Sequence, residues 1–75
     1  MGNRKGDIEM GHRMIKELLR IYGSKSKIVR NFGCAHLTLY GWEMGNTPGG
    51  AFLAKLHYAG GDVIWVLTGR RVDNG

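Results

Sequence analysis

The 75-residue sequence has a single cysteine, a single proline and no long run of apolar residues. Because Cys34 has no second cysteine, no internal disulfide can form, and one cysteine with three scattered histidines does not match the spacing of a zinc finger. No apolar stretch approaches the roughly 18 residues of a membrane span, and no apolar block follows the charged start MGNRKGDIEM as it would in a signal peptide. These absences predict one small, reduced cytoplasmic domain with no metal and no other cofactor.

The patterns that carry catalysis are also missing. The sequence contains no Ser-His-Asp grouping, no paired carboxylates of the acid–base kind and no phosphate-binding loop that ends in Gly-Lys-Ser or Gly-Lys-Thr. The glycine-rich stretch 45–50 lacks the lysine and the preceding strand of such a loop, and Cys34 occupies an apolar position suited to packing. We therefore expect that the chain is not an enzyme.

Positive charge exceeds negative charge, since 11 Lys and Arg residues stand against 6 Asp and Glu residues, a net charge of +5. Eight of the cations fall in residues 1–30, and only Lys55 lies between Asn31 and Gly69. A basic surface indicates a partner with a phosphate backbone or an anionic lipid, although charge alone favours the simpler interpretation of a solvated face. We expect no membrane partner, because the core needs the apolar face of the basic first helix.

Glycines divide the chain into stretches with helical spacing, which predict five helices at about 7–22, 25–32, 35–44, 48–58 and 63–68. Asp7, Ser24, Thr47 and Asp62 are expected as N-caps, with Pro48 in the first turn of the fourth helix. The expected inward positions are Ile8, Gly11, Ile15, Leu18, Leu19, Tyr22, Ile28, Val29, Phe32, Leu39, Trp42, Trp65 and Val66, and the fourth helix is expected to run through Phe52, Leu53, Leu56 and Tyr58. Only VIWVL has the composition of a strand, and one strand has no partner, so an all-α fold is predicted.

The stretch 25–44 is the most informative part of the sequence. Two short helices meet at a tight turn that contains Gly33, and glycine permits the left-handed conformation that such a turn needs. The apolar positions Ile28, Phe32, Leu39 and Trp42 hold these helices together, while the second helix keeps an outer face free. This arrangement is typical of a helix-turn-helix, whose second helix enters the major groove of DNA, and the alternative is an ordinary helical hairpin.

Two segments resemble a known family. GCAHLTLYGWEMGNT resembles the turn and recognition helix of lambda-repressor-like domains, and GGDVIWVLTGRR resembles the last helix of phage CI-type repressors. The resemblance covers roughly residues 15–71 and implies a compact five-helix domain that binds double-stranded operator DNA sequence-specifically. Members of the family are often homodimers and repress transcription by occluding a promoter in the bacterial host cell.

By this resemblance the chain divides into three parts. Residues 1–6 would form a flexible basic arm, residues 7–69 the helix-turn-helix DNA-binding domain, and residues 70–75 a linker or truncated hinge. The sequence is then expected to be the N-terminal part of a longer phage repressor.

The resemblance places six residues where base edges are read, at the leading end and outer face of the recognition helix: Ala35, His36, Leu37, Thr38, Tyr40 and Gly41. His36 can donate to guanine, Leu37 can contact a thymine methyl group, and Thr38 and Tyr40 can bond to phosphates or base edges. Unlike many relatives, this helix carries no Lys, Arg, Asn or Gln, so strong bidentate readout is absent. Specificity then depends on His36, on apolar contacts, on DNA shape or on the arm.

A second group of residues is expected to contact phosphates: Ser24, Lys25, Lys27, Asn46, Thr47, Gly49 and Gly50, near the starts of the second and fourth helices. Each also has a structural interpretation, as an ordinary cap, a surface lysine or a flexible loop. Arg4 and Lys5 are candidates for an arm that wraps the duplex, or else they are disordered. Ile64 is a candidate dimer contact, or else an isolated exposed aliphatic.

A protein-interaction module is the alternative function. The same fold can bind an antirepressor or another regulatory partner, and a recognition helix without cations, with Leu37 and Tyr40 outward, favours that hypothesis. Charge reversal at Lys25 and Lys27 separates the two, since it would abolish DNA binding but spare an apolar protein contact.

Overall fold

The computed structural model describes residues 4–71, which form helices joined by short connections and contain no strand. The helices are α1 (Arg4–Tyr22), α2 (Lys25–Lys27), the π-helical segment η1 (Ile28–Gly33), α3 (His36–Glu43), α4 (Gly50–Tyr58) and α5 (Val63–Thr68). Because α2 continues into η1 without a break, the two form the second of five helices, and the predicted all-α fold is confirmed.

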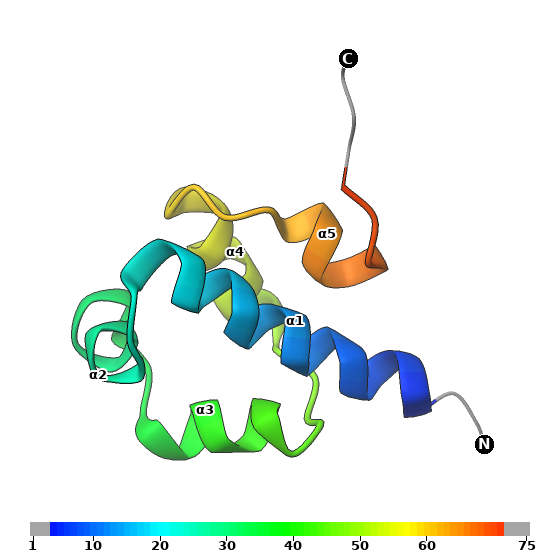
Figure 1. Cartoon of the computed structure of the whole chain (residues 1–75), viewed down its shortest axis with the longest axis horizontal. Helices are drawn as coiled ribbons and strands as arrows, with labels where there is room; N and C mark the ends of the chain where they lie inside the picture. The colour runs from blue at the N-terminus through cyan, green and yellow to red at the C-terminus, as the bar shows by residue number, and fades with distance from the viewer. Residues whose placement is uncertain (1–3, 72–75) are drawn as a thin grey trace.

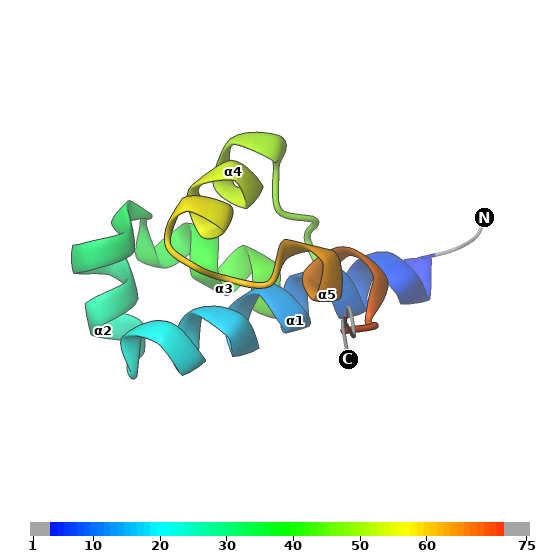
Figure 2. The ribbon, with the colours of Figure 1, turned by 90° about the horizontal axis from the view of Figure 1, so that it is seen from above.

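α1 is the central element of the fold. It lies between α3 and α5, which contact it from opposite sides (Figure 1). α4 lies behind α1, as the view from above shows (Figure 2). α3 and α5 are therefore separated by α1 and present different surfaces to solvent.

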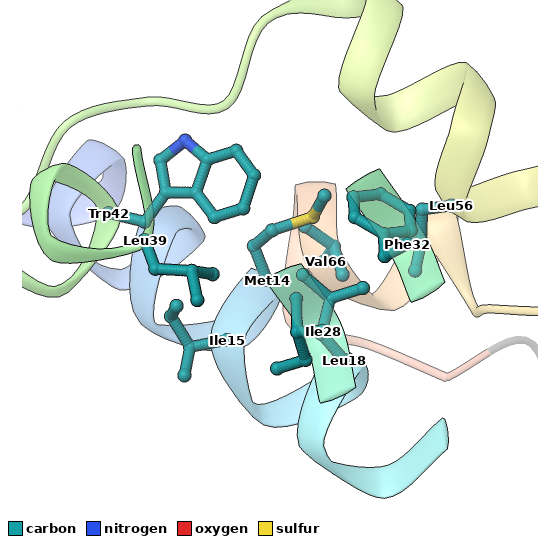
Figure 3. Close-up of a cluster of buried hydrophobic side chains, with 9 residues drawn as sticks. All are labelled: Met14, Ile15, Leu18, Ile28, Phe32, Leu39, Trp42, Leu56 and Val66. Carbon is teal, nitrogen blue, oxygen red and sulfur yellow. The ribbon is translucent and has the colours of Figure 1, made fainter. Parts of the chain in front are cut away.

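Nine side chains from all five helices form the core (Figure 3): Met14, Ile15, Leu18, Ile28, Phe32, Leu39, Trp42, Leu56 and Val66. All of these except Met14 and Leu56 were expected to face inward. Tyr58 of α4 has an exposed side chain, 86% of it accessible. It follows Leu56 by two residues, which on a helix turns it to the opposite side.

α1 and α3 approach each other closely at Gly11. A Cβ atom at this position would lie 2.6 Å from the carbonyl oxygens of both Trp42 and Asn46. Only glycine permits this crossing, so the predicted inward position of Gly11 is confirmed. The side chain of Ile8, also expected inward, lies outside the described part of the chain.

Two of the four expected N-caps are confirmed. Ser24 Oγ accepts a hydrogen bond from the backbone N–H of Lys27 (3.2 Å), and Asp62 Oδ1 accepts one from the N–H of Trp65 (2.9 Å). Both satisfy a backbone donor that a helix start leaves without a partner.

The expected cap at Asp7 is wrong, because α1 begins at Arg4. Arg4 and Lys5 have high helix propensity, and Gly6 does not stop the helix. Residues 4–6, expected in a flexible arm, therefore have a helical backbone. The remaining arm residues, 1–3, lie outside the described residues.

The expected cap at Thr47 is also wrong, because α4 begins at Gly50 with Gly49 as its extended N-cap. Thr47 and Pro48 belong to the connection before the helix. Pro48 is buried in that connection.

Candidate nucleic-acid interface

A tight turn at Gly33 joins η1 to α3, as the sequence predicted. Gly33 ends η1 in the left-handed region, with φ of 89°, and Cys34 and Ala35 are extended before α3 begins. Lys55 Nζ donates to the Gly33 carbonyl (2.9 Å) and lies over the Phe32 ring. The cation thus satisfies a helix-end carbonyl and holds the turn against α4.

α3 is held on its inner side by two large buried side chains. Leu39 and Trp42 are 2% and 3% exposed, and the Trp42 ring meets the Phe52 ring edge-on at a centroid distance of 5.2 Å. His12 Nε2 on α1 donates to the carbonyl oxygen of Glu43 (2.9 Å). α3 is therefore fixed in orientation from α1 and α4.

The outward face of α3 is apolar. Leu37, Tyr40 and Met44 are 76%, 56% and 64% exposed, and their spacing of three and four residues places them on one face. We call these three residues the α3 stripe. Met44 was not among the predicted contacts, although its seven-residue spacing from Leu37 was a signal that could have found it.

The remaining predicted base contacts surround this stripe. Ala35 and His36 are exposed at the leading end of α3, and Thr38 is half-buried. Gly41 is partly covered by the side chain of Asn46, whose Nδ2 would lie 2.8 Å from a Cβ at that position. Gly41 can therefore offer a partner only backbone atoms, and these are partly covered by Asn46.

The cations of α2 and η1 differ in their partners. Lys25 forms an ion pair with Glu43 of α3, through Nζ and Oε2. Lys27 and Arg30 are exposed, and within residues 4–71 neither forms an ion pair or a side-chain hydrogen bond. The sequence reasoning selected Lys27 and missed Arg30.

The predicted phosphate contacts of the second group are separated in space. Asn46 is tied to the end of α3, where its N–H donates to the Gly41 carbonyl (2.8 Å). Gly49 and Gly50 lie at the start of α4, and Figure 2 shows α4 apart from α3. The structure thus brings Asn46 to the outward face of α3 but does not bring the α4 start there.

The opposite side of α1 carries charged contacts to α5. Arg13 Nε donates to the carbonyl of Val66 (2.9 Å), and Nη2 donates to that of Leu67 (3.4 Å). The carbonyls at a helix C-terminus attract a cation, so Arg13 stabilises the end of α5. This basic residue of α1 therefore has a structural role.

Glu17, one turn further along α1, is at the other end of α5. Its side chain is 1% exposed, accepts two hydrogen bonds from Arg20 (3.2 and 2.7 Å), and accepts a third from the N–H of Asp62 (2.8 Å). The bonds from Arg20 hold the pKa of the Glu17 carboxyl below its ordinary value near 4.5, and the Asp62 N–H and Arg71 act in the same direction against burial. Glu17 is therefore a buried, charged acceptor that joins α1 to α5.

Arg71 attaches the segment after α5 to the fold. Its guanidinium pairs with Asp62 (2.9 Å) and lies 4.3 Å from the centre of the Trp65 ring. A linker was predicted at residues 70–75. Of these, Arg71 is bound to the fold, and residues 72–75 lie outside the described part of the chain.

α5 exposes two aliphatic side chains one turn apart. Ile64 is 50% exposed, as expected for the candidate dimer contact, and Leu67 is 42% exposed. α5 lies on the opposite side of α1 from α3 (Figure 1), so both surfaces are open at the same time.

Cys34 packs at the turn, as its apolar position predicted. Its side chain is partly buried against the core, and this burial raises the pKa of the thiol. A raised pKa favours the protonated thiol, which is the less nucleophilic form.

Comparison with protein-family models, curated proteins and solved structures gives no match. Across residues 4–71, no group of three or more His, Cys, Asp or Glu side chains is arranged to hold a metal ion. The helices of the same range are each too short or too polar to cross a membrane.

Proposed function

We propose that the chain is a sequence-specific double-stranded DNA-binding domain of the phage-repressor type, with α3 in the major groove. The supporting observation is that Leu39 and Trp42 fix the inner side of α3 while the α3 stripe on the opposite side has no partner within residues 4–71. A helix held rigidly on one side and open along the other matches what groove insertion requires. The site of action would be the cytoplasm of a bacterial host cell.

Exposed cations next to α3 support the same proposal. Lys27 and Arg30 lie on the helix that precedes the turn, where phosphates flank a groove-bound α3. Lys25 lies at the start of α2, and it would exchange the carboxylate of Glu43 for a phosphate on binding. Breaking the ion pair of Lys25 and Glu43 costs little free energy, because both side chains are solvent-accessible.

Two copies of the chain would read two half-sites about 34 to 36 Å apart, or a multiple of that spacing. Ile64 and Leu67 on α5 are the candidate contact between the copies, because they are exposed on the side away from α3. No such dimer is needed for the binding of one α3 to one half-site.

The test is fluorescence-detected selection from a randomised duplex pool, followed by titration with salt. We expect an enriched motif whose affinity falls steeply as salt rises, with a log–log slope of about −0.9 for each phosphate contacted. Lys27→Glu should weaken binding and reduce this slope. Arg70→Glu changes the net charge equally but lies beyond α5, and it should have little effect.

A protein-interaction module is the second candidate function, and the exposed apolar side chains of the α3 stripe favour it. An antirepressor or other regulatory protein would then cover the stripe. If the chain shows no duplex binding at low salt, the DNA-binding proposal is wrong and this candidate replaces it.

A further inference from the structure

The exposed apolar side chains of the molecule are concentrated on α3. The described residues expose six large hydrophobic side chains, and three of them, the α3 stripe, lie on α3 and its C-cap. The others are on α4 and α5. Exposure of apolar area to water is unfavourable, so a cluster of exposed apolar side chains indicates a partner that covers it.

The polar groups that normally read bases are not available on this face. Within α3 and its C-cap, the one charged side chain is Glu43, and Lys25 holds its carboxylate. His36 is the remaining polar group at the exposed leading end, and Thr38 is half-buried. The face therefore lacks the bidentate donors that recognise guanine and adenine.

One feature of the major groove suits an apolar side chain, namely the 5-methyl group of thymine. Leu37 and Met44 lie seven residues apart, which is about 10 Å along a helix. This length corresponds to about three base pairs at about 3.4 Å each. The stripe can therefore contact methyl groups on neighbouring base pairs in one groove.

The positive charge on the helix that precedes α3 favours DNA over an apolar protein groove. Lys27 and Arg30 are exposed on that helix. A thymine-rich major groove has methyl groups along its base edges and phosphates on both sides. One partner therefore complements both the stripe and the cations. An apolar protein groove would complement the stripe alone.

From this complementarity we infer that the α3 stripe reads thymine methyl groups, so that the preferred half-site contains two or more thymines within about three consecutive base pairs. The inference rests on the proposed function and specifies its ligand. Specificity arises from apolar contact along Leu37, Tyr40 and Met44, with His36 as the polar contact at the leading end.

The test uses two randomised duplex pools, one made with thymine and one with uracil, which differs by the absence of the 5-methyl group. The thymine pool should enrich a motif with at least two thymines in the half-site. Replacing each of these thymines with uracil should weaken binding about fourfold, the value for removing one buried methyl-sized apolar group from contact.

A variant pair assigns the effect to the stripe. In Leu37→Ala the preference for thymine over uracil should disappear at one position, because the side chain that contacts the methyl group is gone. Leu37 is 76% exposed, so the fold should be retained. Tyr58→Ala removes an exposed aromatic from α4 and should keep the full preference.

The outcomes separate the inference from the function on which it rests. If both pools enrich the same motif with equal affinity, or if the motif lacks thymine, the inference is wrong and sequence-specific DNA binding stands. If Leu37→Ala, Tyr40→Ala and Met44→Ala all keep the parent preference, the stripe does not read the methyl groups. If neither pool enriches a motif, the proposed function fails together with the inference.

Discussion

The α1–α5 junction and the outward face of α3 lie on opposite sides of α1 and have opposite chemistry. The junction is charged, and its groups satisfy one another: Arg13 binds the end of α5, and Glu17 binds its start. The α3 stripe is apolar and has no partner within residues 4–71. Charge stabilises the fold on one side, whereas the other side is open for binding.

This difference changes the meaning of the net charge. The +5 balance counts cations regardless of their partners. Five cations have side-chain contacts within residues 4–71, namely Arg13, Arg20, Lys25, Lys55 and Arg71. Lys27 and Arg30 have no contact of this kind within that range, so the position of a cation is more informative than the total charge.

The largest expected effect lies in the junction. Glu17→Ala should lower the free energy of unfolding by about 3 kcal/mol, because the Asp62 N–H and two guanidinium groups lose a buried charged acceptor. Urea denaturation measures the difference. Glu9→Ala is the matched control, since that carboxylate is half-exposed and should contribute less than about 0.5 kcal/mol. Equal effects in the two variants would show that the junction charges do not stabilise the fold.

The next effect concerns how α1 holds α3. Gly11→Ala should lower the free energy of unfolding by about 2 kcal/mol, because the new Cβ meets two backbone carbonyl oxygens that cannot move without shifting α3. Thermal unfolding followed by circular dichroism measures it. A Cβ at Gly50 meets no atom within 4 Å, so Gly50→Ala should be neutral. A neutral Gly11→Ala would show that the close crossing of α1 and α3 is not required.

Acid should destabilise the α1–α5 junction. The pKa of Glu17 is lower in the folded chain than its ordinary value near 4.5, so its contribution to stability is fully present above that pH and is lost as pH falls through the folded pKa. Asp62 acts in the same direction, because the Trp65 N–H and Arg71 lower its pKa. Unfolding by urea at a series of pH values should show a steeper acid loss in the parent than in Glu17→Gln. Identical acid profiles in both proteins would exclude Glu17 as the group responsible.

The smallest effect on stability is expected at the α3 stripe. Leu37→Ala and Tyr40→Ala should each change the free energy of unfolding by less than about 0.5 kcal/mol, because both side chains are mostly exposed. The same variants should weaken binding of the selected duplex. Parallel measurement of unfolding and of duplex affinity tests the comparison directly, and a loss of stability without a loss of affinity would contradict it.

Much of the local structure could be predicted from short stretches of sequence. The successful predictions depend on groups within a few residues of one another. They are the caps at Ser24 and Asp62, the turn at Gly33 and the inward positions Leu39 and Trp42. Helix periodicity and capping act at this range, which is why these predictions succeeded. The exposed positions His36, Leu37 and Tyr40 were expected from the resemblance to lambda-repressor-like domains.

The wrong predictions concern the starts of two helices and one buried residue of α1. At these positions the local sequence does not identify the helix boundary or the residue that will be buried. The pair Thr47 and Pro48 has the composition of a helix start, but Pro48 is buried in the connection and α4 starts at Gly50. Asp7 has the composition of a cap, but the preceding residues also favour a helix. Glu17 was not selected, because a glutamate in the sequence does not indicate that the start of α5 will cover it.

The sequence by itself determined the five helical segments, the glycine turn and an α3 without cations, because each depends on neighbouring residues. Only the tertiary structure decided which cations have structural roles. Arg13 and Val66 are separated by 53 residues, and their hydrogen bond exists because α1 and α5 pack side by side. The packing of α1 against α3 likewise leaves the α3 stripe as one open surface. A charge or an apolar residue in a sequence has no assigned partner until packing brings distant segments together.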